Sequence, residues 1–484
     1  MEKFIINFSS KLSGFCSRLF NLLKRRLENL PKKGTIDKMY SENGKKSIYF
    51  NNRLDIIIFI SVFILIISPI IFSSILRLIA KSGQIDIYLS AGCEEFFGGK
   101  TMETLALEFE KQNPDLRIKL LNVSGEKGRE PDILFFDEGE FNALIASDAL
   151  LPLGSFLGDE SGGQKQAVPL VSFMDLLFYN IELLRAAGFD RPPKTRDEFL
   201  VYAKTISAAN NGILADAAGA VMALSSENMQ SLSREIFSWI WAGGGNFWPN
   251  EDTAPVINTR QMINDFIFLN RLFRGEAQAL SPEPDMEPGA VPQNKALFTN
   301  SFETTGDQAL EGFARGKIAM IIASARTIPA LREKMGDNAF GITTIPGAGT
   351  AGKYSVSLTG IFAGINKNCE YPDAAWVFLD FLAAKSPLFC AQLKAIPGYA
   401  PDLSPGDNRN YIKEDIFYSK AWDIFETSLV IKGFLGVPCA QEYENAVYEE
   451  IKLFFEGNRT AQETVNAIQK RWDEVFANSG AETR

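Results

Sequence analysis

The sequence contains no histidine among its 484 residues. Its absence excludes Ser-His-Asp and Cys-His nucleophile arrangements, histidine general bases and histidine-bearing zinc sites. Two acidic doublets, Glu94-Glu95 and Asp137-Glu138, could in principle supply the carboxylate pair of a glycosidase. Such doublets are more often solvated, or accept hydrogen bonds from a polar ligand. We therefore expect no enzymatic activity, no catalytic residue, no metal site and no cofactor.

Cysteine is also scarce, with five residues in the whole chain, which is too few for a disulfide scaffold. Cys16 precedes a long apolar run and the other four cysteines follow it. If the part after the run is exported, disulfides can persist there. The sequence does not choose among the three ways of pairing these four. They are Cys93, Cys369, Cys390 and Cys439.

The apolar run itself, Ile56 to Leu76, holds 21 uncharged residues. At about 1.5 Å per residue it is long enough to cross a hydrocarbon core of about 30 Å. The first 55 residues carry 12 Lys and Arg against 5 Asp and Glu. By the positive-inside rule, this charge predicts a cytoplasmic tail at 1–54, a transmembrane helix at 55–79 and the rest of the chain outside.

Two alternatives to a retained anchor stay open. A cleaved signal peptide would need a small-residue site, and the nearest, Leu78-Ile79-Ala80, has a bulky leucine in it. A lipoprotein signal would use the loose motif Leu89 to Cys93, but that cut removes a predicted strand. The tail has apolar residues at helical spacing with interleaved Lys and Arg, a pattern typical of a membrane-surface helix. Its alternatives are a tail without a specific role and a true start at Met39.

The chain beyond residue 55 has an acidic balance, with 37 Lys and Arg against 54 Asp and Glu. That charge argues against nucleic acid as a partner. Some 400 residues exceed what one hydrophobic core usually supports, which indicates two domains.

From residue 84 onward the apolar pattern alternates between strand and helix. Strands are expected at 85–89, 116–123 and 132–136, with a helix at 101–112. This order is typical of an α/β domain with parallel strands. Ligands bind such sheets beyond the carboxyl ends of the strands. We therefore expect the site at two loops, Ser90 to Gly99 and Asp137 to Phe141.

Six segments in register resemble the extracellular solute-binding proteins of ABC importers, in the carbohydrate-binding group that includes maltose-binding protein. Together they span nearly all of residues 84–478. The segment at 168–206, which begins "VPLVSFMDLLFYNIELLRAAGF", is similar to the family's first crossover between lobes. The six segments are 105–121, 131–153, 168–206, 316–331, 358–384 and the helices after Pro438.

The resemblance implies a two-lobed α/β fold of the periplasmic-binding-protein type with discontinuous lobes. The first lobe would hold 84–177 and 362–433, and the second 178–361 and 434–484, with chain crossings near Phe178 and Phe362. It implies a substrate-binding protein, anchored in the cell membrane with its binding domain in the periplasm or extracellular space, that delivers a sugar or sugar derivative to an ABC permease. The alternative is a sensory or scaffolding protein that signals through its anchor.

The candidate ligand-binding residues combine aromatic platforms with polar side chains, as sugar sites do. Arg326 stands where the family often has a tryptophan, which puts a stacked oligosaccharide site in doubt. For each aromatic residue the alternative is core packing. The first-lobe candidates are Glu94, Phe96, Phe97, Phe136, Asp137, Glu138, Phe173 and Asp175, and those of the second lobe are Trp241, Trp248, Arg326, Tyr354, Tyr443 and Glu444.

Overall fold

The structure is a computed structural model, and the part of the chain that follows residue 84 forms one compact unit, 85–484. The predicted tail and membrane span lie outside the described residues. Within the described part, no helix is both long and apolar enough to cross a membrane. The described residues are 84–121, 129–157, 166–209, 211–225, 233–248, 254–274, 301–347, 354–393, 396–397, 414–431 and 433–482.

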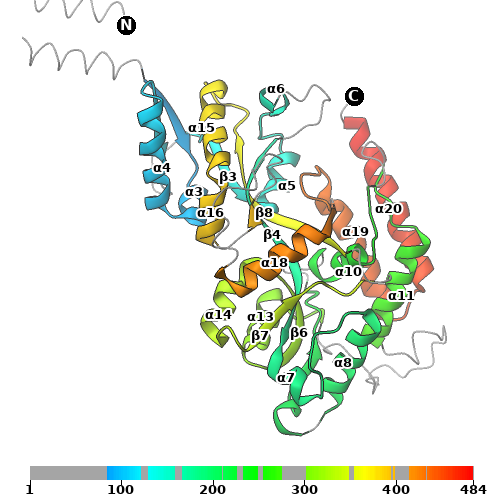
Figure 1. Cartoon of the computed structure of the whole chain (residues 1–484). Coiled ribbons are helices and arrows are strands. Elements are labelled where there is room, and N and C mark those ends of the chain that lie inside the picture. The colour runs from blue at the N-terminus through cyan, green and yellow to red at the C-terminus, as the bar shows by residue number, and fades with distance from the viewer. Residues whose placement is uncertain are drawn as a thin grey trace, which may run out of the picture. The chain divides into compact units, whose positions relative to one another are not determined.

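The first lobe is built on the predicted parallel strands. Strand β1 (Ile85–Leu89) pairs in parallel with β2 (Leu116–Leu120) and with β3 (Ile133–Asp137). Helix α4 (Gly99–Gln112) connects β1 to β2 and buries Met102, Leu105 and Phe109. The predicted strand–helix–strand unit is thus confirmed. The other helices of this lobe are α3 (Gly92–Phe97), α5 (Glu138–Ala146), α6 (Gly154–Leu157), α15 (Pro372–Ala384) and α16 (Ser386–Leu393), and α4, α15 and α16 lie beside its strands in Figure 1.

The two segments expected as loops are helical instead. Residues 92–97 form α3, which ends at Gly98, where φ is +79°. The second segment is the start of α5, because the side chain of Asp137 accepts hydrogen bonds from the backbone N–H groups of Gly139 and Glu140. Both helices nevertheless begin at the carboxyl ends of strands, so the two segments lie at the edge of the sheet where they were predicted.

The second lobe holds a smaller sheet and most of the helices. Strand β6 (Ile318–Ser324) pairs in parallel with β5 (Ala218–Ala220), and both β6 and β7 (Phe340–Thr343) pair antiparallel with β4 (Val168–Asn180). Two further helical segments, η2 (Ser233–Phe237) and η3 (Ala325–Thr327), carry site residues. The α-helices are α7 (Ile181–Ala186), α8 (Arg196–Ala208), α10 (Ser238–Ala242), α11 (Arg260–Arg274), α13 (Gly306–Ala314), α14 (Ile328–Met335), α18 (Ile416–Thr427), α19 (Ala440–Phe455) and α20 (Ala461–Glu482).

Two long strands run through both lobes. In β4, residues 168–174 pair with β8 (Tyr354–Ile365) in the first-lobe sheet, and residues 175–180 pair with β6 and β7. In β8, residues 361–365 pair with β3, whereas 354–357 pair with β10 (Ser428–Ile431). The partners therefore change at Met174/Asp175 and near Ser357/Leu358, earlier in each strand than the expected crossings at Phe178 and Phe362. A short strand, β9 (Ile396–Pro397), also pairs with β4.

Helix α18 packs differently from the expected division. Its buried residues Phe417, Tyr418 and Ile424 join the hydrophobic cluster of β6 and β7. The Phe417 ring stacks on Phe340, with 4.5 Å between the ring centroids. The range 362–433 is consequently not one packing unit, because α15 and α16 belong to the first-lobe core and α18 to the second.

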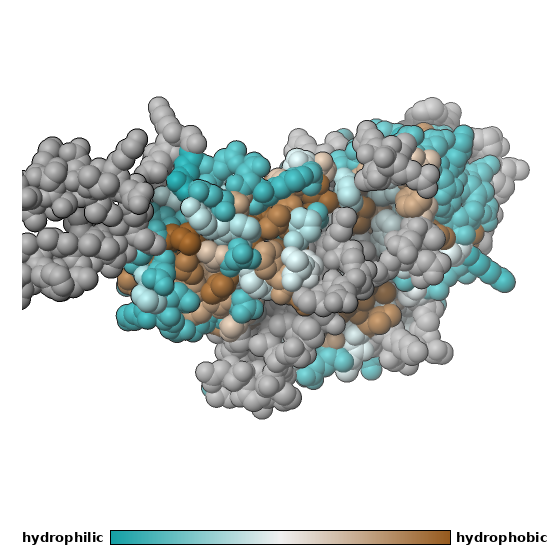
Figure 2. Space-filling view, turned by 90° about the horizontal axis from the view of Figure 1, so that it is seen from above, coloured by the Kyte–Doolittle hydropathy of each residue, from teal (hydrophilic) through white to brown (hydrophobic). Residues whose placement is uncertain are grey.

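The structure joins none of the four cysteines after residue 84 to another in a disulfide. Cys93 is fully buried in α3, and burial raises the pKa of its thiol to about 12. Figure 2 shows one face of the molecule, on which hydrophilic residues predominate and smaller apolar areas lie between them. Exposed large apolar residues are spread over several elements, as is normal for a folded surface. Examples are Leu107, Val201, Val377, Ile416 and Leu429.

Candidate functional site

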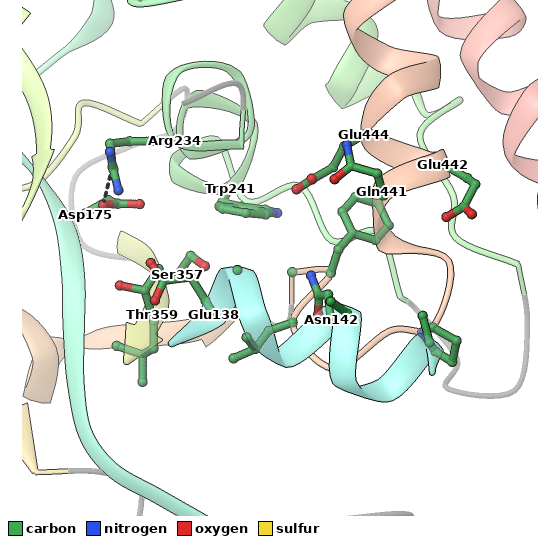
Figure 3. Close-up of a pocket in the computed structure, with 18 residues that line it drawn as sticks. Glu138, Asn142, Asp175, Arg234, Trp241, Ser357, Thr359, Gln441, Glu442 and Glu444 are labelled. Atoms are coloured by element: carbon green, nitrogen blue, oxygen red, sulfur yellow. Dashed lines mark hydrogen bonds and ion pairs between the residues drawn. The ribbon is translucent and has the colours of Figure 1, made fainter. Parts of the chain in front are cut away.

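A cavity of about 650 Å³ lies where the two lobes meet. Helix α5 of the first lobe forms one wall, and η2, α10 and α19 of the second lobe form the others. The strands β4 and β8 pass along it. Its polar and aromatic lining consists of Glu138 and Asn142 on α5, Asp175 on β4, Ser357 and Thr359 on β8, Arg234 on η2, Trp241 on α10, Phe434 before α19, and Gln441, Glu442 and Glu444 on α19. All of these except Phe434 are labelled in Figure 3.

An ion pair occupies one end of this cavity. The Nε of Arg234 lies 2.9 Å from Oδ1 of Asp175. Asp175 is only 6% exposed and is the first residue of β4 that pairs with the second-lobe sheet. The negative charge of Asp175 is the main cause of the raised pKa of Arg234. The pair thus places a charged group of the second lobe beside the crossing strand.

Glu138 follows Asp137 at the start of α5 and faces the same cavity (Figure 3). Burial is the main cause that raises the pKa of its carboxyl group, and the charges of Asp137 and Asp175 act in the same direction. Among the described residues Glu138 has no ion-pair partner. Its charge is therefore held at a cost that a suitable ligand group can relieve.

Trp241, together with Phe434, supplies the aromatic part of the cavity lining. Its indole is 4% exposed and packs against Phe237 and Phe247. A side-chain carbon at Gly433 would lie 3.1 Å from the indole, so glycine there leaves room for the ring. The buried indole N–H has no hydrogen-bond partner within the described residues. Buried donors are normally paired, so this unsatisfied N–H is an exception within the described part of the chain.

A second cavity of about 670 Å³ lies along the other side of α5. The guanidinium of Arg326, on η3, stands 5.9 Å from the ring centre of Phe96 and 6.0 Å from that of Phe173. This contact links the second lobe to the first and fits a cation–π interaction. The polar and aromatic lining includes Ser90, Glu95, Phe96, Phe136, Asp137, Glu140, Ser147 and Arg326.

Eight of the fourteen predicted site residues line one of these two cavities. Phe97 and Tyr443 do not, because both rings are packed in the cores. Phe97 contacts Phe135 and Phe389, and Tyr443 stacks on Phe434. Phe173 is 2% exposed and meets only the edge of the site, through Arg326. The eight are Glu138, Asp175, Trp241 and Glu444 in the first cavity and Phe96, Phe136, Asp137 and Arg326 in the second.

The remaining three candidates lie elsewhere. Glu94, on α3, lines neither cavity. Trp248 donates its indole N–H to the carbonyl of Gly433 at 3.0 Å, so it supports the cavity wall from behind. Tyr354 begins β8, and its backbone pairs with Ser428.

Sequence reasoning missed Arg234, Asn142, Ser357, Thr359 and Gln441. For Gln441 a signal existed. In α19 the residues Ala440, Tyr443, Val447 and Ile451 recur at helical spacing and are buried. That face places Tyr443 in the core and turns Gln441 and Glu444 away from it. No comparable local pattern marks Arg234, which reaches Asp175 across 59 positions of the chain.

Replacement of Asp137 by alanine is expected to lower the free energy of unfolding by about 1 kcal/mol, the usual cost of losing a helix cap. The Asp137 carboxylate accepts from the N–H of Gly139 at 3.0 Å and of Glu140 at 3.3 Å. Asp137→Asn keeps these acceptors and should retain most of the stability. Urea unfolding followed by circular dichroism measures both. Equal stability of the alanine variant and the parent would show that the cap contributes nothing.

The family model for bacterial extracellular solute-binding proteins matches residues 98–387. This range includes β3, both crossing strands and every element that lines the second cavity except α3 and the turn before it. It stops before α19, which contributes Gln441 and Glu444 to the first cavity.

Solved structures share the architecture. Maltose-bound MalE3 of T. maritima is 18% identical, with 81% of this chain and 99% of that chain covered and a TM-score of 0.57. The cyclic alpha-maltosyl-1,6-maltose binding protein of Arthrobacter globiformis is 16% identical, with 82% of this chain and 100% of that chain covered and a TM-score of 0.60. UgpB of Mycobacterium tuberculosis, in complex with glycerophosphocholine, is 16% identical, with 82% of this chain and 99% of that chain covered and a TM-score of 0.59. At these identities the likeness shows the fold alone, and it confirms the predicted two-lobed α/β architecture.

Proposed function

Because this chain belongs to the family of bacterial extracellular solute-binding proteins, we propose that it captures a sugar or sugar derivative between its lobes and delivers it to an ABC permease. The observation that carries the proposal is the cavity between the lobes. It offers the Trp241 ring, an indole N–H without a partner among the described residues, and carboxylates on α5, β4 and α19. Sugars present apolar ring faces edged by hydroxyl groups, which such a lining matches. Structural neighbours that bind maltose or a cyclic maltosyl sugar support this ligand class.

The role is binding rather than turnover. The chain has no histidine, and the carboxylates near Trp241 are suited to accept hydrogen bonds from hydroxyl groups. Capture would use bending of the two strands that run through both lobes, since small φ/ψ changes at a few residues can close a hinged protein. We place this hinge at Met174/Asp175 in β4 and near Ser357/Leu358 in β8, where the strands change partners.

Ligand binding is expected to stabilise and compact the protein. At a free ligand concentration of about 100 times Kd, binding adds about 2.7 kcal/mol to the free energy of unfolding. A thermal-shift screen of residues 84–484 against sugars, polyols, phosphorylated sugars and peptides would find the ligand class. Small-angle scattering at saturation should then show a smaller radius of gyration. A screen in which peptides alone stabilise the protein would overturn the sugar assignment, and a bound ligand that leaves scattering unchanged would overturn the hinge.

We further propose that the apolar run at 56–76 anchors the protein in the cell membrane with the lobes outside. The uncharged run and its basic flank support the anchor, and the extracellular family supports the placement of the lobes. Protease added to spheroplasts should digest the lobes and spare the tail. A mature protein that begins after Ala80, or one acylated at Cys93, would contradict a retained anchor.

A further inference from the structure

The first cavity carries an excess of negative charge. Its lining contains one guanidinium, that of Arg234, and four carboxylates. The second cavity repeats the imbalance, since Arg326 is its one basic side chain against three acidic ones. The four carboxylates of the first cavity belong to Glu138, Asp175, Glu442 and Glu444, and the three of the second to Glu95, Asp137 and Glu140.

Arg234 is poorly placed to receive an anionic ligand. It is already bound to Asp175 at 2.9 Å, and the charges of Glu138 and Glu235 also act on it. An incoming carboxylate or phosphate would have to compete with a buried carboxylate held by the backbone of β4. It would also approach the unpaired charge of Glu138. Like charges brought together in a partly buried site repel strongly.

Glu138 is the carboxylate best placed to receive a cation. It is half-buried at the start of α5, and no ion-pair partner for it occurs within the described residues. Burial raises its pKa, the charges of Asp137 and Asp175 add to the rise, and the positive charge of Arg234 opposes it without forming an ion pair. A protonated amine near its oxygens would neutralise this charge and form a charge-assisted hydrogen bond, which is stronger than a neutral one.

Among cationic ligands, Trp241 favours those whose charged group is attached to a sugar ring. Figure 3 shows its indole with Asp175 and Arg234 on one side, Gln441 and Glu444 on the other, and the α5 residues Glu138 and Asn142 across from it. The ring face can hold the apolar face of a sugar and also attracts a cation. The buried N–H, which has no partner among the described residues, can donate to a hydroxyl or ring oxygen. A linear polyamine would satisfy the carboxylates and leave this donor unpaired.

We infer that the solute is an amino sugar, held with its protonated amine against Glu138 and its ring against Trp241. This inference rests on the proposed function, since it names the substrate class of the same cavity. It also states what the site rejects, namely phosphorylated and uronic acid sugars.

The test compares matched probes on the full-length protein, in a detergent without a sugar headgroup. Glucosamine, N-acetylglucosamine, glucose and glucuronic acid, each also as the β-1,4-linked dimer, differ in charge and share one ring. Titration calorimetry should give the amine probes about 10- to 100-fold higher affinity than the neutral ones, the range expected for one charge-assisted hydrogen bond. The acidic probes should bind most weakly.

The variant Glu138→Gln tests the assigned carboxylate. It should remove most of the preference for amine over neutral probes. Because Glu138 lines the cavity for both kinds of sugar, the readout is the ratio of the two affinities in the variant and in the parent. Because burial penalises the charge of Glu138, the variant should be at least as stable as the parent, so lost binding cannot be ascribed to unfolding. Glu182→Gln, on the exposed first turn of α7 away from both cavities, is the matched control and should keep the preference.

The outcomes separate the two proposals. A neutral or acidic sugar that binds as tightly as its amine counterpart overturns the amino-sugar inference and leaves the sugar-binding function standing. If none of the probes binds, both are rejected. An amine preference that survives Glu138→Gln rejects Glu138 as the partner of the amine.

Discussion

Asp265→Ala is expected to lower the free energy of unfolding by about 3 to 5 kcal/mol, the usual cost of removing one partner from a buried ion pair. Asp265 is fully buried on α11, and its Oδ1 lies 2.5 Å from Nη1 of Arg196 on α8. The same guanidinium donates to the carbonyl oxygens of Trp239 and Pro346. Without Asp265 its positive charge stays buried and uncompensated.

The same two helices offer a matched control. Arg271 on α11 pairs with Asp197 on α8 at 3.4 Å, and the side chain of Asp197 is 81% exposed. Exposed pairs contribute about 0 to 1 kcal/mol, so Asp197→Ala should change stability little. Urea unfolding of both variants measures the difference. Equal losses would show that burial does not decide the contribution of these pairs. A double replacement, Arg196→Met with Asp265→Leu, should recover most of the lost stability.

Trp241→Ala is expected to reduce affinity for the bound sugar about 30-fold or more, which corresponds to the roughly 2 kcal/mol or more that a central aromatic residue contributes to binding. The variant loses both the ring face and the indole N–H that is buried without a partner in the described part of the chain. Trp241→Phe keeps a ring and loses only the N–H, so its affinity should fall between those of the parent and the alanine variant.

Stability has to be measured alongside affinity, because Trp241 also packs against Phe237 and Phe247. Removal of a buried tryptophan typically costs about 3 to 5 kcal/mol. Affinities should therefore be determined by calorimetry at a temperature where circular dichroism shows each variant folded. A folded Trp241→Ala variant with the affinity of the parent would remove Trp241 from the site.

The sequence predicted the first lobe better than the site. Strands β1, β2 and β3 and helix α4 follow from local apolar periodicity. The parallel pairing of β1 with β2 and with β3 is confirmed. The conformation around Phe96 and Phe97 was harder to predict from the sequence. Expected as a loop, it is a helix, and a helix turns adjacent residues to different sides. Phe97 therefore enters the core against Phe389 while Phe96 faces Arg326.

Asp137 illustrates a second limit of local reasoning. A carboxylate at the end of a buried strand suits both a ligand and a helix N-terminus, and the sequence does not separate these roles. In the structure its oxygen accepts from two backbone N–H groups of α5, while the next residue, Glu138, faces the cavity with Asp175 and Trp241. These three are far apart in the chain, so only the folded arrangement brings them together.

The passage of β4 and β8 through both lobes has a consequence for how the protein is made. The first-lobe sheet needs β8, and the second-lobe core needs α19 and α20 near the end of the chain. A nascent chain that has reached residue 350 therefore holds neither lobe complete, although domains usually fold as units from the N-terminal side during synthesis. We expect both lobes of such a chain to remain incompletely folded until late in translation. Under the placement of the lobes outside the membrane proposed above, this order of segments would give the chain time to cross the membrane before its lobes fold.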